Sequence, residues 1–249
     1  MSIRSRLPIT MLLLVAFLLL GCTPGEPDGK TFIGDSIELG EGELHTWARL
    51  DLEGNPVSVG VTFTEGMLSG LPGYVKQYSM EMPEEAASTL FTHVLFDWNP
   101  AGHDPVGRYT VPHFDFTFYT IPVRERASIP QGQSTTGFEP QHLPQDYFRT
   151  VAFSFGAQGV YWQDAGAPEW NGQRYTEATL IYGSYEGQMI FIEPMITKKY
   201  LETKPNVTHE IKQPQAYQRS GYYPTEYRIG YQDGEYTVSL ENFVFSEGA

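Results

Sequence analysis

The segment Val111–Tyr119 (VPHFDFTFY) carries residues capable of metal or acid–base chemistry at alternate positions. Because successive side chains of a β-strand point to opposite faces, one face would carry Pro112, Phe114, Phe116 and Phe118, and the other His113, Asp115, Thr117 and Tyr119. The phenylalanine face is typical of a core contact. The second face has neither lysine nor glutamate, the usual residues of a solvent-facing strand, so we expect it to form the wall of a cavity.

A second strand is predicted at Phe91–Trp98 (FTHVLFDW), where His93 and Asp97 share one face. The turn-rich loop that follows contains His103. An antiparallel pairing of the two strands across this loop would bring His93 and His113 toward each other.

Imidazole and carboxylate groups together are typical ligands of zinc, iron, manganese or nickel. His113 and Asp115 would lie about 6–7 Å apart at Cα on one strand face, so that both can reach one ion. His103, His93 and Glu193 are the further candidate ligands, and a divalent transition metal is the one candidate cofactor that these residues indicate.

Two other interpretations of these residues stay open. His113 and Asp115 can hydrogen-bond to each other or to loop backbone with no chemical role. Without a metal, they can also act as a general base and the group that orients it. Glu193, just before Pro194, can equally be a turn residue bonded to backbone N–H groups.

The elements that must position these side chains are mainly strands. Short alternating runs of aromatic and β-branched residues are punctuated by Gly and Pro. Hairpins are predicted at Glu53-Gly54-Asn55, Glu186-Gly187 and Asp233-Gly234, and short helices at 83–90 and 197–203. The sequence therefore predicts a mostly β fold: one antiparallel β-sandwich or barrel domain with one or two short helices.

The N-terminus resembles a bacterial lipoprotein signal. Residues 1–21 have an apolar run of signal-peptide length that ends just before Cys22, the single cysteine of the chain. We expect lipidation at Cys22, a flexible tether over residues 22–30, and one domain over residues 31–249. The expected partner is a membrane, reached through this lipid anchor, and the expected location is the cell envelope. In a Gram-negative cell, Thr23 after the cysteine resembles the outer-membrane destination.

The composition excludes several classes of function. The chain has 16 basic and 30 acidic residues and a net charge of −14, which argues against nucleic acid as a partner. No G-x-S-x-G elbow and no G-x-x-x-x-G-K-[ST] phosphate loop is present. Trp98, Trp162 and Trp170 leave carbohydrate stacking open. Exposed strand edges leave homo-oligomerisation open.

Three blocks of the sequence resemble, in order, an exported bacterial domain family of unknown function. They lie at His93–Tyr119 (with WNPxGHxP and PHFDFxFY), at Gly159–Glu169 (GVxWxDxxxPE) and at Ile181–Thr197 (IYGSYxGxMIFxEPMIT). That family pattern has histidines where this chain has Thr117 and Tyr161. The resemblance therefore implies that two candidate ligands have been replaced here.

Three functions follow from these observations. The first is a lipid-anchored, extracytoplasmic protein of an uncharacterised family with a binding or structural role at the cell envelope. The second is a metal-dependent enzyme or metal-binding protein that uses the His/Asp strand-face cluster. The third is a carbohydrate-binding module. The sequence names no specific ligand.

Overall fold

Two antiparallel sheets stacked face to face form the body of the protein. The structure, a computed structural model, describes residues 29–134 and 136–249. The expected signal peptide, Cys22 and most of the tether lie outside the described residues. The first strand begins at Gly29. Within the described ranges, every helix is too short or too polar to cross a bilayer.

The first sheet has six strands. In spatial order they are β1 (Gly29–Leu39), β2 (Gly42–Asp51), β3 (Pro56–Thr64), β15 (Glu235–Ser246), β14 (Gly221–Gln232) and β13 (Val207–Glu210). The second sheet has seven: β4 (Lys76–Glu81), β5 (His93–Asn99), β6 (His113–Tyr119), β12 (Gln188–Thr197), β11 (Ala178–Tyr185), β10 (Val160–Asp164) and β8 (Tyr147–Phe148). A small third sheet pairs β7 (Gly132–Gln133) with β9 (Phe153–Ser154). The sandwich form of the predicted mostly β fold is confirmed.

Helices are short, as expected. In the part of the chain that the structure describes, two are α-helical, α1 (Val123–Ala127) and α2 (Lys198–Leu201), and four are 3-10 helices at Glu65–Leu68, Glu84–Thr89, Pro140–His142 and Pro168–Trp170. The predicted helix at 83–90 is thus a 3-10 helix, and it ends at Leu90, whose backbone is left-handed (φ 68°). The predicted helix at 197–203 is one turn, α2, capped by the Thr197 side chain.

The core fills the space between the two large sheets. Phe63 of the six-stranded sheet stacks on Phe116 of the seven-stranded sheet with ring centroids 6.0 Å apart, and on Tyr236 at 5.1 Å. Phe114 and Phe118 are also fully buried in this core. The predicted phenylalanine face of 111–119 is therefore confirmed, although the strand itself begins at His113.

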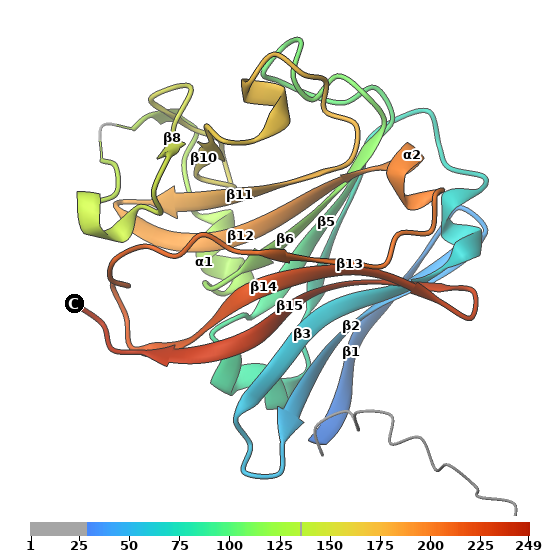
Figure 1. Ribbon diagram of the computed structural model, residues 1–249, viewed down its shortest axis with the longest axis horizontal. Coiled ribbons are helices and arrows are strands. Elements are labelled where there is room, and N and C mark those ends of the chain that lie inside the picture. The colour runs from blue at the N-terminus through green and yellow to red at the C-terminus, as the bar shows by residue number, and fades with distance from the viewer. Residues whose placement is uncertain (1–28, 135) are drawn as a thin grey trace, which may run out of the picture.

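The polar face of β6 consequently points away from the core, to the outer side of the seven-stranded sheet. Segments 100–112 and 150–177 lie over that side, and Figure 1 shows their green and yellow loops gathered at the top of the sandwich. We call this outer side the covered face. The outer side of the six-stranded sheet carries Trp47, Ser58, Thr62, Glu226 and Arg228, among others, and lines a shallow concavity. We call it the open face.

All three predicted hairpins are present. Glu186 and Gly187 have φ of 50° and 79° and join β11 to β12, and Asp233 and Gly234 have φ of 52° and 93° and join β14 to β15. Two consecutive residues with positive φ give the tight turn whose twist matches the flanking strands. These turns set the register that places side chains opposite one another.

Candidate metal site in a covered cavity

The register between β5 and β6 decides which candidate ligands meet. Asn99 pairs with His113, Asp97 with Asp115, and His93 with Tyr119. Asn99 and His93 are six residues apart, about 20 Å along a strand. His93 and His113 therefore lie at opposite ends of the strand pair, and the expected approach of these two histidines does not occur.

Three of the predicted ligands converge at the loop end of β6. His103, His113 and Asp115 each offer one ligand atom, and these atoms all lie within 4.8 Å of one another. His103 Nε2 is 3.4 Å from Asp115 Oδ2, and His113 Nε2 is 3.2 Å from Asp115 Oδ1. In a tetrahedral site with bonds of about 2.0–2.1 Å, neighbouring ligand atoms are about 3.3–3.4 Å apart. The spacing therefore suits a shared ion.

Backbone carbonyls orient both histidines. His113 Nδ1 lies 2.7 Å from the Val111 carbonyl oxygen, and His103 Nδ1 lies 2.6 Å from that of Asp104. A carbonyl oxygen only accepts, so each Nδ1 carries a proton, and each ring in its neutral form would present the Nε2 lone pair to the cluster. Metal-ligating histidines commonly donate their other ring N–H to a carbonyl oxygen in this way.

Asp115 is held in the same way. The Asn99 side-chain amide donates to Asp115 Oδ2 at 2.8 Å. The other oxygen, Oδ1, and His113 Nε2 are both buried and make no hydrogen bond within the described chain. Their 3.2 Å separation is short, but it lacks hydrogen-bond alignment. A cation between them would satisfy both atoms.

Without a metal, the cluster is an ion pair. Burial disfavours the charged form of His103, but the hydrogen bond and charge of Asp115 outweigh it and raise the pKa of His103 to about 9. Burial likewise opposes ionisation of Asp115, yet the electrostatic interactions with His113 and His103 hold the pKa of Asp115 below its usual range. A protonated His103 or a metal ion can therefore balance the charge of this carboxylate.

Glu193 faces the same cavity but is not one of the three clustered ligands. It is buried on β12, and its Oε2 accepts a hydrogen bond from Thr117 Oγ1 at 2.7 Å. Burial and the Asp115 charge raise the pKa of Glu193 well above its usual value. The turn role considered for Glu193 does not apply, because β12 continues through Pro194 to Thr197.

His93 makes different contacts. Its ring stacks on Tyr119 with centroids 4.9 Å apart, and its Nδ1 lies 3.0 Å from Thr92 Oγ1. Burial, with a smaller effect from the charge of Arg126, lowers the pKa of His93 to about 3. It is a neutral, packed side chain.

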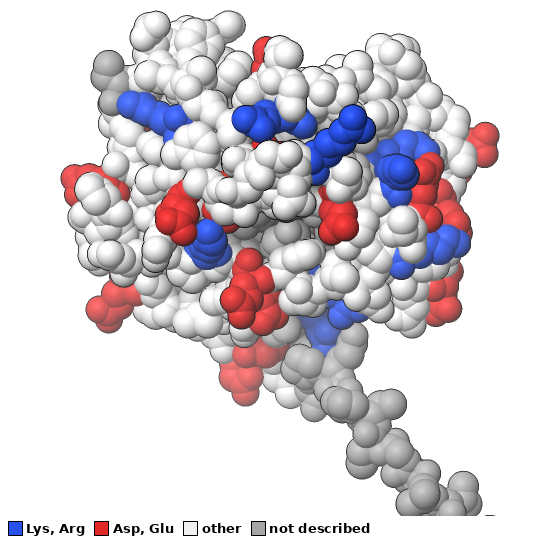
Figure 2. Space-filling view, turned by 45° about the horizontal axis from the view of Figure 1, so that its top comes forward, with Lys and Arg blue, Asp and Glu red and all other residues white. Residues whose placement is uncertain are grey.

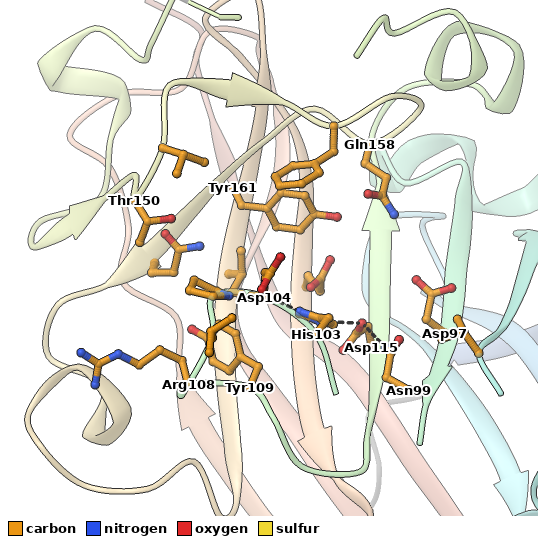
Figure 3. Close-up of a pocket in the computed structure, with 18 of the residues that line it drawn as sticks. Asp97, Asn99, His103, Asp104, Arg108, Tyr109, Asp115, Thr150, Gln158 and Tyr161 are labelled. Atoms are coloured by element: carbon orange, nitrogen blue, oxygen red, sulfur yellow. Dashed lines mark hydrogen bonds and ion pairs between the residues drawn. The ribbon is translucent and has the colours of Figure 1, made fainter. Parts of the chain in front are cut away.

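A cavity of about 770 Å³ opens above the cluster, and His103, Asp115 and Glu193 line it. Figure 3 shows Tyr161 and Gln158 on the side of the cavity opposite the His103–Asp115 pair. Thr117 and Tyr161, the two positions at which the resembling family pattern has histidines, thus both belong to the covered face. Figure 2 shows the side of the protein that carries these loops, where charged side chains form small groups of both signs on a mostly uncharged surface.

Sequence reasoning missed three residues of this site. Asn99 falls just after the predicted strand Phe91–Trp98, in the expected loop, although it ends β5 directly opposite His113. The alternation places Asp97 on the correct face but does not identify it as part of the site. Burial, and then the Asp115 charge, raises the pKa of Asp97 to about 7. Gln163 of β10 lines the cavity from a strand that is far away in the sequence, and no local pattern identified it.

The fold and the cluster together define a β-sandwich with a His/His/Asp site beneath a covered cavity. The chain is similar over residues 51–98 to a family described as TTHB210-like, hypothetical protein TTHB210. This match fits an uncharacterised family of unknown function. It includes His93 and Asp97 but ends before His103, His113 and Asp115, and it covers well under half of the chain. No curated protein and no solved structure matches.

Proposed function

We propose that this protein binds one divalent transition-metal ion through His103, His113 and Asp115, and uses it to hold a small ligand in the covered cavity. The convergence of three ligand atoms within 4.8 Å carries the proposal. Three protein ligands leave at least one coordination position for a bound molecule.

Two carboxyl groups favour chemistry at this site in addition to binding. Asp97 and Glu193 line the same cavity, and burial raises the pKa of both. A carboxyl group whose pKa is about 7, as for Asp97, can donate or accept a proton near neutral pH. A metal-dependent enzyme is therefore the second candidate function.

The N-terminal sequence also suggests where in the cell the protein acts. We infer that the run before Cys22 is a lipoprotein signal and that acyl chains hold the protein at a membrane surface of the cell envelope. The resemblance to exported proteins agrees with this. Mass spectrometry of the N-terminal peptide from a bacterial membrane fraction would detect the lipidated Cys22, whereas an unmodified Cys22 would contradict the inference.

Metal content tests the proposed site. The full-length protein, purified without chelator or affinity metal, would be equilibrated with Zn²⁺ or Mn²⁺, desalted and subjected to elemental analysis. We expect about one ion per chain, and a loss of affinity of at least about a hundredfold in His113→Ala, since removal of a ligand costs more than removal of an outer-shell partner. Asn99→Ala, which frees Asp115, should weaken binding by about 10–100-fold.

The matched control is His209→Ala. His209 is also a partly buried histidine with an unpartnered Nε2, but it stacks on Tyr227 in the six-stranded sheet. Its substitution should leave the metal content unchanged. A folded wild-type protein that binds no ion, or equal binding in His113→Ala, would contradict the proposal.

A further inference from the structure

The wall of the cavity opposite the ligand cluster is largely apolar. Phe155, Tyr161 and Ile181 line it, and the rings of Phe155 and Tyr161 pack edge to face with centroids 5.6 Å apart. The volume of about 770 Å³ lies in the range of sites for drug-sized molecules. A ring or a branched chain therefore fits against this wall.

The side chains that line the cavity offer an anionic ligand no free lysine or arginine. Four acidic residues line it: Asp97, Asp104, Asp115 and Glu193. Arg108 is the one lysine or arginine among the lining residues, and it is already engaged. Its guanidinium lies over the Trp170 ring at 4.7 Å and donates to the Glu169 carbonyl oxygen.

Unpartnered acceptors show where a ligand would donate hydrogen bonds. Gln163 Oε1 and Asp97 Oδ1 are buried, line the cavity and accept no hydrogen bond within the described residues. Gln163 is in β10 and Asp97 in β5, so the cavity has such an acceptor on each side. A buried acceptor left unpaired destabilises the protein, and ligand hydroxyl groups that donate to it would remove this penalty.

We propose that the ligand is an uncharged, hydroxylated ring compound. Its ring packs on Phe155 and Tyr161, one hydroxyl group donates to Gln163, and another oxygen coordinates the metal. This inference rests on the proposed metal site, because the ion provides the anchoring point for the second oxygen.

Three probes of one size and different charge test the ligand class. They are 4-hydroxybenzyl alcohol (neutral), 4-hydroxybenzoate (anionic) and tyramine (cationic). Each would be added to the Zn²⁺-equilibrated full-length protein, and binding would be measured by saturation-transfer NMR, with the zinc content determined in the same samples. We expect the neutral probe to bind at least tenfold more tightly than either charged one.

Gln163→Leu separates a ligand contact from a structural role. The substitution nearly preserves volume and removes a buried acceptor that has no partner, so we expect thermal stability and zinc content to be retained while the neutral probe loses about tenfold in affinity. Gln232→Leu, the same change on the open face, should alter neither. Loss of stability without loss of probe binding in Gln163→Leu would overturn the role of Gln163 and, with it, the proposed binding mode.

The outcomes distinguish the two proposals. Zinc bound with a charged probe preferred, or with no probe bound, would overturn the ligand class and leave the metal site intact. A folded protein without zinc would overturn the metal site and this inference together.

Discussion

The outer faces of the two sheets follow the same alternation of side chains but have opposite properties. On the open face, polar groups have partners at the surface: Trp47 Nε1 donates to Thr62 Oγ1 at 3.0 Å, and Arg228 donates to Asn206 Oδ1 at 2.7 Å. On the covered face, His113 and Asp115 are buried with unpartnered atoms. A polar strand face thus becomes a candidate site when loops exclude water from it, because burial makes unpaired charge costly.

A glycine beneath an aromatic ring occurs on both faces, but the ring is buried to a different extent on each. Gly60 lies beneath the indole of its cross-strand partner Trp47, and Gly183 lies beneath the ring of its partner Phe191. In both cases the missing side chain lets an aromatic ring lie flat on the sheet. Trp47 is only half-buried, whereas Phe191 is completely buried.

Alanine at these two glycines should produce the largest difference between the faces. A Cβ at position 183 would lie 1.9 Å from the Phe191 ring, and one at position 60 would lie 2.5 Å from Trp47. Because Phe191 has no room to move, we expect Gly183→Ala to cost about 3 kcal/mol or more of unfolding free energy, or to prevent folding. Trp47 can turn toward solvent, but the new Cβ would also lie 2.9 Å from Ser239 Cβ, so Gly60→Ala should cost less than Gly183→Ala, about 1–2 kcal/mol.

Urea denaturation of the two variants would measure this difference. Equal losses of unfolding free energy in Gly183→Ala and Gly60→Ala would contradict the expected difference, because the open face would then be packed as rigidly as the covered one. If Gly183→Ala prevents folding, the Gly60→Ala result still shows whether the open face tolerates a displaced ring.

The two faces should also differ in how strongly acid reduces stability, because His93 is buried on the covered face. Burial lowers the pKa of His93 to about 3, whereas histidine in the unfolded chain has its ordinary pKa of about 6.5. The unfolded state therefore binds more protons below pH 6.5, so this contribution to stability falls as the pH drops and levels off near pH 3. Between pH 7.5 and pH 5, the loss due to His93 should be about 2 kcal/mol.

His93→Gln should remove this part of the acid sensitivity. His45→Gln, on the open face, serves as the matched control, and thermal or urea unfolding at pH 7.5 and pH 5 would provide the measurement. An unchanged acid sensitivity in His93→Gln, relative to the wild type, would show that His93 protonates in the folded protein and is not shielded as its packing implies.

The smallest predicted effect concerns the two hairpin turns, one in each sheet. Glu186 and Asp233 both have positive φ, near 50°, before a glycine. Asparagine tolerates this conformation better than glutamate does. We expect Glu186→Asn to stabilise the protein by roughly 0.5 kcal/mol and Asp233→Asn to have almost no effect, as measured by the melting temperature. Equal gains at both turns would contradict this ranking.

The local features of the fold follow from the order of residues along the chain. The alternation in 113–119 predicted which face of β6 enters the core, since the phenylalanines must be buried. Gly-containing turns predicted the hairpins, because positive φ is costly for most other residues. Two of the candidate ligands, His113 and Asp115, were found in this way because they lie on one strand.

Which side chains come together in the cavity depends on how distant segments pack. The register of β5 on β6 separated His93 from His113 and placed Asn99 against Asp115, and no local pattern specifies that pairing. The path of a loop places His103 in the ligand cluster. Gln163 lines the cavity because β10 lies three strands away from β6 in the same sheet. The pKa shifts of Asp97 and Glu193 arise from burial by the covering loops. Contacts and burial of this kind depend on the packing of distant segments, which spacing along the chain does not encode.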